Sequence, residues 1–241
     1  IIECGAQCSG GNYSKWYEVN DLSNIGYPII EMQKDGNFIV TKNKNSGGLV
    51  NRFTVSEQIL YELGDPKNYI SPDVIVDFTS IKLEDLGNNQ VKVEGIKGKK
   101  PTDTFKVSIN YHRGYKAVGQ ITVSGPSAIK KANMITEIIW DRLSRKGLEY
   151  SKKNSEFIGF NSCHRGIDKE ELEPSEIVLK ISVMDSDKNK VNEFGKEIAP
   201  LITNGPPGVT GFSGGRPKAQ EVIAYWPSLV DKKYIETELT I

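Results

Sequence analysis

A short segment near the start of the chain, residues 3–12, combines a carboxylate, two amides and three glycines. Its glycines let the backbone approach a ligand closely and present N–H groups to an anion such as a phosphate or carboxylate. The segment lacks the ending of a phosphate-binding loop, and a tight loop after a strand is the alternative. The candidates are Glu3 as catalytic acid or base, and Gln7, Gly10, Gly11 and Asn12 as substrate-binding residues.

A second pair of glycines, Gly47 and Gly48, follows Ser46 ahead of a predicted helix. Paired glycines before a capped helix can form an anion-binding nest. The predicted helix begins several residues later, so a flexible turn is the alternative. We include Gly47 and Gly48 among the candidate substrate-binding residues.

The segment 204–217 is a loop with five glycines and three prolines. Prolines stiffen such a loop while glycines permit positive φ angles, and loops of this length in compact domains are often functional. Arg216 could hold a carboxylate or phosphate through its planar, bidentate guanidinium group. The candidates here are Gly208, Gly211 and Arg216, and a surface loop with a structural arginine is the alternative.

The cysteines offer little evidence for a metal or a nucleophile. Cys4, Cys8, Cys163 and His164 could form a metal site if they converged, but compact Cys-x-x-Cys pairs are absent. Cys163 and His164 are sequence neighbours, which would point to opposite faces of a strand. We therefore expect free thiols and no metal site, and the sequence does not indicate a cofactor.

Composition sets the class of protein. The 241 residues are 37% hydrophobic, with 31 basic and 31 acidic residues, so the chain can build a core and carries no net charge to attract nucleic acid. No apolar run approaches the roughly 20 residues that span a bilayer, and no signal peptide is visible, so we expect a cytoplasmic protein with no membrane or nucleic-acid partner. The start at Ile1, without Met, suggests a fragment of a longer protein.

The first half contains signals for short strands and one helix. Residues 34–37 predict a hairpin through Asp-Gly. Thr54 and Glu57 predict a capping box for a helix that ends near residue 63. Strands are expected at 74–76, 81–83 and 91–93.

The second half predicts the order β-β-α-β-β-α-β from Thr104 onward. Strands are expected at 105–111 and 117–123, with a turn at 112–114, and later at 156–160, 177–183 and 222–226. Apolar residues at helical spacing predict a helix over 127–146, capped by Ser124 or Ser127 and ended by Gly147. A second helix is expected over 188–202, kinked or shortened by Pro200.

These elements predict an α+β fold with mostly antiparallel sheets and helices on one face. We divide the chain into residues 1–103, a glycine-rich α/β segment completed by a missing N-terminal half, and residues 104–241, a ferredoxin-like α+β domain. The polar stretch 97–103 is the candidate boundary between them.

Several motifs together resemble the acyclic terpene utilisation protein A (AtuA) family. They span essentially the whole chain, in order: Ile2-Glu3-Cys4-Gly5-Ala6-Gln7, Asn24-Ile25-Gly26-Tyr27-Pro28-Ile29, Gly47-Gly48-Leu49-Val50, Gln58-Ile59-Leu60-Tyr61-Glu62, Pro72-Asp73-Val74, Gly208-Val209-Thr210-Gly211 with Gly214-Gly215-Arg216-Pro217, and Glu221-Val222-Ile223-Ala224-Tyr225-Trp226-Pro227. Members of that family are roughly twice as long, so this chain resembles their C-terminal half. Relatives often carry a small residue at the position of Cys8, which argues against a required role for its thiol.

The resemblance implies a place in the catabolism of citronellol, geraniol and branched-chain acids, which passes through acyl-CoA thioesters. We expect a hydratase- or lyase-type enzyme acting on an acyl-CoA or a small carboxylate, with the loops 5–12 and 205–217 around one cleft. The alternative is a non-catalytic binding or assembly module, in which Trp226 and Pro227 near a sheet edge anchor a partner. In either case we expect a homo-oligomer.

Overall fold

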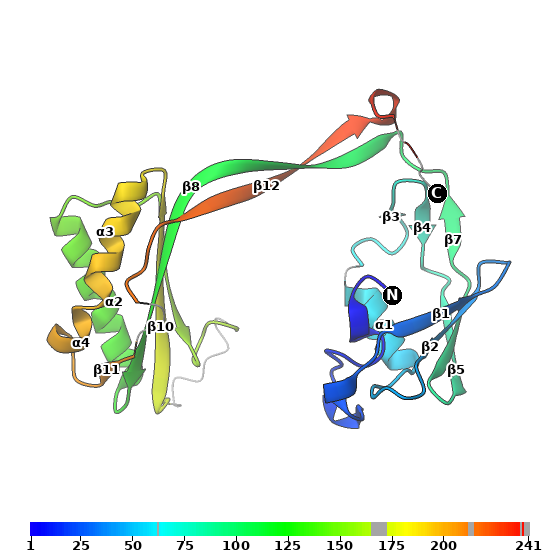
Figure 1. The fold of residues 1–241 in the computed structure, drawn as a ribbon, viewed down its shortest axis with the longest axis horizontal. Coiled ribbons are helices and arrows are strands. Elements are labelled where there is room, and N and C mark those ends of the chain that lie inside the picture. The colour runs from blue at the N-terminus through cyan, green and yellow to red at the C-terminus, as the bar shows by residue number, and fades with distance from the viewer. Residues whose placement is uncertain (62, 165–172, 212–214, 237, 239–241) are drawn as a thin grey trace. The chain divides into compact units, whose positions relative to one another are not determined.

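The computed structural model describes residues 1–61, 63–164, 173–211, 215–236 and 238 of the chain (Figure 1). The chain forms two compact units. The first comprises residues Ile1–Lys106 and Leu229–Ile241, and the second comprises Val107–Ser228. Among the described residues, no helix is both long and apolar enough to cross a membrane.

The first unit contains two antiparallel sheets and one α-helix. Its four-stranded sheet has the order β1-β2-β6-β5, and its three-stranded sheet has the order β3-β4-β7. The elements are β1 (Pro28–Met32), β2 (Phe38–Lys42), α1 (Arg52–Tyr61), β3 (Tyr69–Ile70), β4 (Ile75–Asp77), β5 (Lys82–Gly87), β6 (Gln90–Glu94) and β7 (Lys97–Lys99). Short 3-10 helices lie at Gly5–Gln7, Trp16–Glu18, Leu22–Asn24 and Lys232–Tyr234.

Both hairpins of the four-stranded sheet follow from their turn residues. The predicted turn between β1 and β2 is confirmed: Gly36 has a φ of 85°, and its N–H donates to the carbonyl of Gln33 at 3.1 Å. Asn88 and Asn89, between β5 and β6, have φ angles of 50° and 58°, as a tight hairpin turn requires. The sheet buries Val40, Val91 and Val93 with Val55 of α1 and the nearby Cys8 and Val50.

The predicted capping box of α1 is wrong. The side chain of Asn51 caps the helix, accepting from the N–H groups of Phe53 at 2.9 Å and Thr54 at 3.0 Å. The Thr54 hydroxyl accepts in return from the Asn51 N–H at 3.1 Å. Asn is a stronger N-cap than Thr, and Asn51 precedes Thr54 by three residues, so the helix begins earlier. Glu57 instead accepts hydrogen bonds from the N–H and hydroxyl of Ser14.

The second unit contains one antiparallel sheet covered by helices. The strand order is β11-β8-β10-β9, and β12 also pairs with β8. The elements are β8 (Thr104–Ser124), α2 (Ala128–Arg145), β9 (Lys152–Ile158), β10 (Glu176–Asp185), α3 (Lys188–Ile198), α4 (Leu201–Asn204), β11 (Val209–Thr210) and β12 (Gln220–Asp231). Figure 1 shows α2 and α3 on the same face of this sheet.

The turn predicted at 112–114 is wrong, because β8 is one strand of 21 residues. Gly114 has a φ of 112°, but an added Cβ would lie 2.6 Å from the carbonyl oxygen of Asp185. Its special backbone geometry therefore serves a close approach to β10 rather than a chain reversal. From Tyr115 to Ser124, β8 pairs without interruption with Asp185 to Glu176 of β10.

Both long helices form where the apolar spacing predicts them. The buried face of α2 carries Ala128, Ala132, Ile135, Ile139 and Leu143, and Gly147 ends the helix with a φ of 69°. Ser127 occupies the N-cap position without a side-chain capping bond. The predicted effect of Pro200 is confirmed, because α3 stops at Ile198 and Pro200 caps the separate helix α4.

The predicted α+β class is confirmed: both units contain open antiparallel sheets, and the second has its helices on one face of its sheet. The element order of the second unit is β8, α2, β9, β10, α3, α4, β11 and β12. The ferredoxin-like assignment itself stays a prediction.

Candidate ligand pocket

A largely apolar pocket of about 430 Å³ lies within the first unit. This volume is within the range of about 300–1,000 Å³ that is typical of sites for small molecules. Aliphatic, aromatic and thioether side chains make up most of the lining, which also includes Glu3, Cys4, Gln58 and Tyr69. Its apolar members are Ile1, Ile2, Ile30, Met32, Phe38, Ile59, Leu63, Val76, Phe78, Ile81, Val93 and Ile96.

Separate elements supply the walls. Ile30, Phe38 and Val93 come from β1, β2 and β6 of the four-stranded sheet. A second wall lies at the smaller sheet, where the rings of Tyr69 and Phe78 pack edge to face, with 5.7 Å between their centroids. An apolar ligand in this pocket would contact both sheets and α1.

Gln58 is the polar side chain that α1 contributes to the pocket. It is only 6% exposed, and its Oε1 atom is buried without a hydrogen-bond partner among the described residues. Buried polar atoms in native proteins are nearly always paired, because an unpaired one loses its bonds to water. Gln58 thus places an acceptor without a partner among the described residues in the wall of this apolar pocket.

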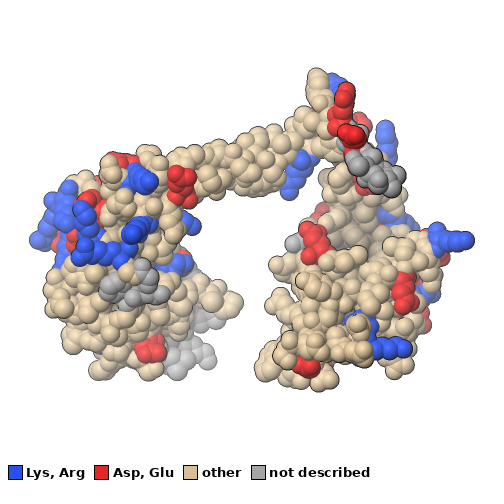
Figure 2. Space-filling model, in the orientation of Figure 1, with Lys and Arg blue, Asp and Glu red and all other residues tan. Residues whose placement is uncertain are grey.

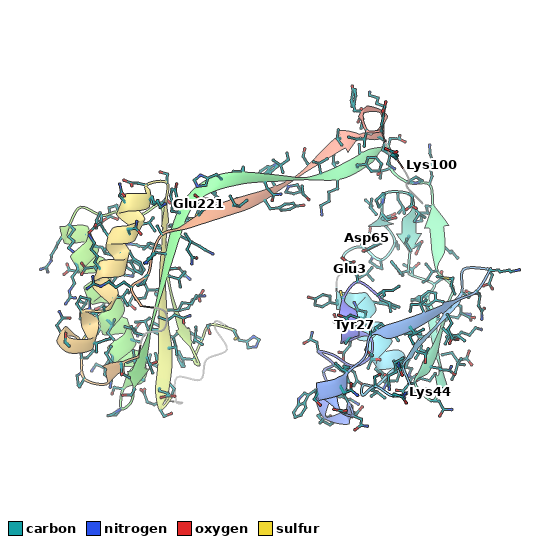
Figure 3. All side chains as sticks on the ribbon, in the orientation of Figure 1. Glu3, Tyr27, Lys44, Asp65, Lys100 and Glu221 are labelled. Atoms are coloured by element: carbon teal, nitrogen blue, oxygen red, sulfur yellow. The ribbon has the colours of Figure 1, made fainter. Side chains whose placement is uncertain are left out.

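Glu3 and Cys4 line the same pocket from the N-terminal segment. Figure 3 shows Glu3 beside α1, and its side chain is exposed to solvent. A carboxylate that touches both water and an apolar pocket can exchange protons with either a bound ligand or solvent. Of the residues predicted from the sequence as site residues, Glu3 is the one that lines this pocket.

The glycine pairs lie together in the first unit, where their role is close packing. Their N–H groups donate hydrogen bonds to backbone carbonyls: Gly10 to Gln7, Gly11 to Ala6, Gly47 to Asn24 and Gly48 to Asn20. A Cβ on Gly48 would lie 2.6 Å from the carbonyl oxygen of Ser9, and the Leu49 N–H donates to that oxygen at 2.8 Å. These contacts explain why glycine is needed, and anion binding by these residues stays a prediction.

The other predicted site residues are distributed over both units. Gln7 is half-buried in the first 3-10 helix, and Asn12 is exposed with a φ of 56°. In the second unit, the carbonyls of Gly208 and Gly211 accept from Ser124 and Thr122 of β8, and Arg216 is exposed. Residues 212–214 of that loop lie outside the described residues. The shared cleft between the two loops stays a prediction.

The cysteines differ in environment. Cys8 is fully buried, and burial raises the pKa of its thiol from 9.0 to about 12, so it is a neutral core residue at physiological pH. Cys163 is exposed and Cys4 is half-buried, and both are free thiols. In the part of the chain that the structure describes, no group of three His, Cys, Asp or Glu could hold a metal ion.

Sequence reasoning missed Gln58 and the apolar walls. One signal was present: Gln58 follows Thr54 and Val55 at helical spacing, and all three are buried on one face of α1. A glutamine at a core position of an amphipathic helix is unusual, because polar groups without partners are avoided there.

A protein-family model described as "Acyclic terpene utilisation family protein AtuA" matches residues 1–241, the whole chain. No curated protein and no solved structure matches the chain.

Proposed function

Because the chain belongs to the acyclic terpene utilisation family AtuA, we propose that its first unit binds the branched apolar chain of an acyclic acid or its acyl-CoA thioester. The family's name suggests a role in acyclic terpene utilisation. The observation that carries the proposal is the 430 Å³ apolar pocket whose lining includes Glu3 and Gln58, the latter with an Oε1 atom that has no partner among the described residues. A branched hydrocarbon chain suits such walls, because it is driven from water without needing polar partners.

Hydratase- or lyase-type chemistry suits the two polar groups. In hydration of an α,β-unsaturated acyl group, Glu3 accepts a proton from water as the water oxygen bonds to the β-carbon. The double-bond electrons shift toward the carbonyl oxygen. Glu3 then gives the proton that it took from water to the α-carbon, which completes the addition of H and OH and restores the Glu3 carboxylate. The Gln58 Oε1 atom accepts a hydrogen bond from the water or the product hydroxyl, which holds that oxygen in position. The proposal places this activity in the cytoplasm.

Thermal unfolding with geranic acid, its CoA thioester and free CoA tests the binding step. The acid and the thioester should raise the melting temperature, since a ligand at a hundred times its Kd stabilises by about 2.7 kcal/mol. Ile59→Trp, which fills the pocket from α1, should remove the effect, whereas Lys44→Ala on an exposed loop outside the pocket lining should keep it. The proposed pocket is wrong if neither ligand stabilises the protein, or if Ile59→Trp responds normally.

Turnover of an unsaturated acyl-CoA tests the chemical step. Glu3→Gln should preserve the thermal shift and lower the hydration rate about 100- to 10,000-fold, the usual contribution of a general acid or base. Equal rates in wild type and variant would remove Glu3 from the mechanism.

A binding or assembly module without catalysis is the second candidate function. The observation that favours it is a set of large apolar side chains exposed on β8 and β12, including Trp226, which is 62% exposed. Ligand binding by the wild type with no turnover of any acyl-CoA would support this candidate over the enzyme.

A further inference from the structure

Part of β8 and part of β12 form a two-stranded ribbon in the second unit. The ribbon consists of residues 107–114 of β8 and 220–228 of β12, which run side by side (Figure 1). In the described part of the chain, β10 pairs with β8 only from Tyr115 to Ser124, beyond the ribbon. An isolated two-stranded ribbon is at best marginally stable in water, so further packing is expected.

The ribbon's sequence predicts a covered face. Val107, Ile109 and Tyr111 alternate with Ser108, Asn110 and His112, the pattern of a strand with one apolar and one polar face. Beyond Gly114, whose positive φ interrupts the regular strand geometry, β8 buries Ala117, Ile121 and Val123 in the core with the helices. The first part of the strand therefore has the pattern of a buried face.

Within the second unit, that face has no cover among the described residues. Val107, Ile109 and Tyr111 are 36%, 44% and 41% exposed. On β12, Ile223 and Tyr225 lie on one face of the strand and Trp226 lies on the other, and they are 61%, 48% and 62% exposed, so β12 adds apolar surface to both faces of the ribbon. Contiguous exposed apolar surface of this kind marks an interaction site.

The charge pattern permits a second copy of the chain as the cover. Residues 107–112 and 222–228 contain no Asp, Glu, Lys or Arg, and the middle of the ribbon is free of them in Figure 2. Two copies of one chain present identical charges to each other in a two-fold contact, so a charged strip would repel itself. A charge-free apolar strip can face its own copy without that cost, and interface cores are depleted of charge.

We propose that the ribbon face carrying Val107, Ile109 and Tyr111 packs against the same face of a second copy of this chain. A two-fold axis through the contact makes the interface self-complementary. The β8 residues and the β12 side chains on the same face expose roughly 400 Å² per copy, given that an aromatic side chain can bury 150–250 Å². The pair then buries about 800 Å², which is below the size of a standard specific interface, so the dimer is weak and dissociates on dilution.

Sedimentation velocity or light scattering across a wide concentration range tests the proposal with the full chain. The mass of the wild type should rise from the 26.8 kDa monomer toward twice that value. Ile109→Lys puts a charge on the apolar face and should remain monomeric. The matched control Ser108→Lys adds the same charge to the opposite face and should dimerise like the wild type.

A wild type that is monomeric at every concentration overturns the proposal. Dimerisation of Ile109→Lys with the same affinity as the wild type also overturns it. So does an equal loss of dimerisation in Ser108→Lys, which would show that the opposite face is involved. Both positions are exposed, so the variants should unfold at the wild-type temperature. Tyr111→Lys provides a second substitution on the same face if Ile109→Lys fails to fold.

Discussion

Replacing Gln58 by methionine should stabilise the protein when no ligand is bound. The Gln58 side chain is 6% exposed and its Oε1 atom has no partner among the described residues. Such an unpaired atom costs roughly 1–3 kcal/mol. Methionine has a similar length and helix propensity, so the substitution removes the polar atom without opening a cavity. We expect the free energy of unfolding to rise by about 1–2 kcal/mol.

Urea and thermal unfolding measure this gain. For a unit of this size, about 1 kcal/mol corresponds to about 4 °C in melting temperature. Gln33→Met is the matched control: Gln33 lies beside the β1–β2 turn in the same unit with its side chain exposed, so its amide is already hydrated. The urea concentration at the midpoint of unfolding should be the same for that variant and the wild type.

The same substitution should weaken ligand binding. A ligand that donates a hydrogen bond to Gln58 loses about 1.4 kcal/mol, or tenfold in Kd, when the acceptor is removed. A more stable protein with weaker binding is the signature of a polar group kept for function. If Gln58→Met instead lowers the stability by more than about 1 kcal/mol, the amide has a partner in the native state and the reasoning fails.

Three further predictions follow from contacts in the first unit. Asn51→Ala removes the cap of α1 and should lower the free energy of unfolding by about 1 kcal/mol, measured by urea unfolding, whereas no change would contradict the assigned cap. Cys8 should resist alkylation in the native protein, whereas the exposed Cys163 should react. Folding raises the pKa of the Cys8 thiol from 9.0 to about 12, so the stability that the neutral thiol contributes is complete below pH 9 and is lost as the pH rises toward 12. Cys8→Ala should reduce this loss of stability at high pH. Asp77 accepts hydrogen bonds from the hydroxyl and the N–H of Thr79 and faces Lys99, and these contacts lower its pKa from 3.8 to about 2. Its stabilising effect is therefore present above pH 3.8 and is lost as the pH falls through 2. The stability of Asp77→Asn should depend less on acid pH than that of the wild type, and an equal dependence would show that these contacts are absent in solution.

The elements with strong local patterns could be predicted from the sequence. The five buried residues of α2 lie at helical spacing, and β10 alternates Ile177, Leu179, Ile181 and Val183 on its buried face. These patterns are specific because the period of the apolar residues matches one type of element. Pro200 likewise acts locally, since it removes a helical hydrogen bond wherever it stands in the helix interior.

The failures occurred where distant residues decide a local conformation. Gly114 has the composition of a turn, but the carbonyl of Asp185 on β10 occupies the space beside it and the strand continues. The cap of α1 is a different case, because two local signals conflict: Asn51 is the stronger N-cap by residue type, whereas the Thr54–Glu57 spacing is that of a capping box.

The pocket is also a product of long-range folding. Its lining residues come from β1, β2, α1, β3, β4 and β6, from the segment that begins at Ile1 and from connecting segments, so no single motif contains it. Glycine-rich loops are often ligand-binding sites, so the sequence predicts binding at Gly47 and Gly48, yet in the structure these glycines mainly allow close backbone packing. Glu3 was chosen for its chemistry, and the fold places it at the pocket.

The two proposals predict different responses to the same pair of variants. The Oε1 atom of Gln58, which has no partner among the described residues, would bind a hydrogen-bond donor on an apolar ligand. The exposed face that carries Ile109 would instead bind an apolar protein surface. Gln58→Met should therefore change the ligand response and leave the dimer intact, and Ile109→Lys should do the opposite. If Ile109→Lys also abolishes the ligand-induced thermal shift, dimerisation and binding are thermodynamically linked, and added ligand must then strengthen the wild-type dimer by the same factor. Sedimentation of the wild type with and without geranic acid measures that factor, and a dimer unaffected by ligand would show that the two sites act independently.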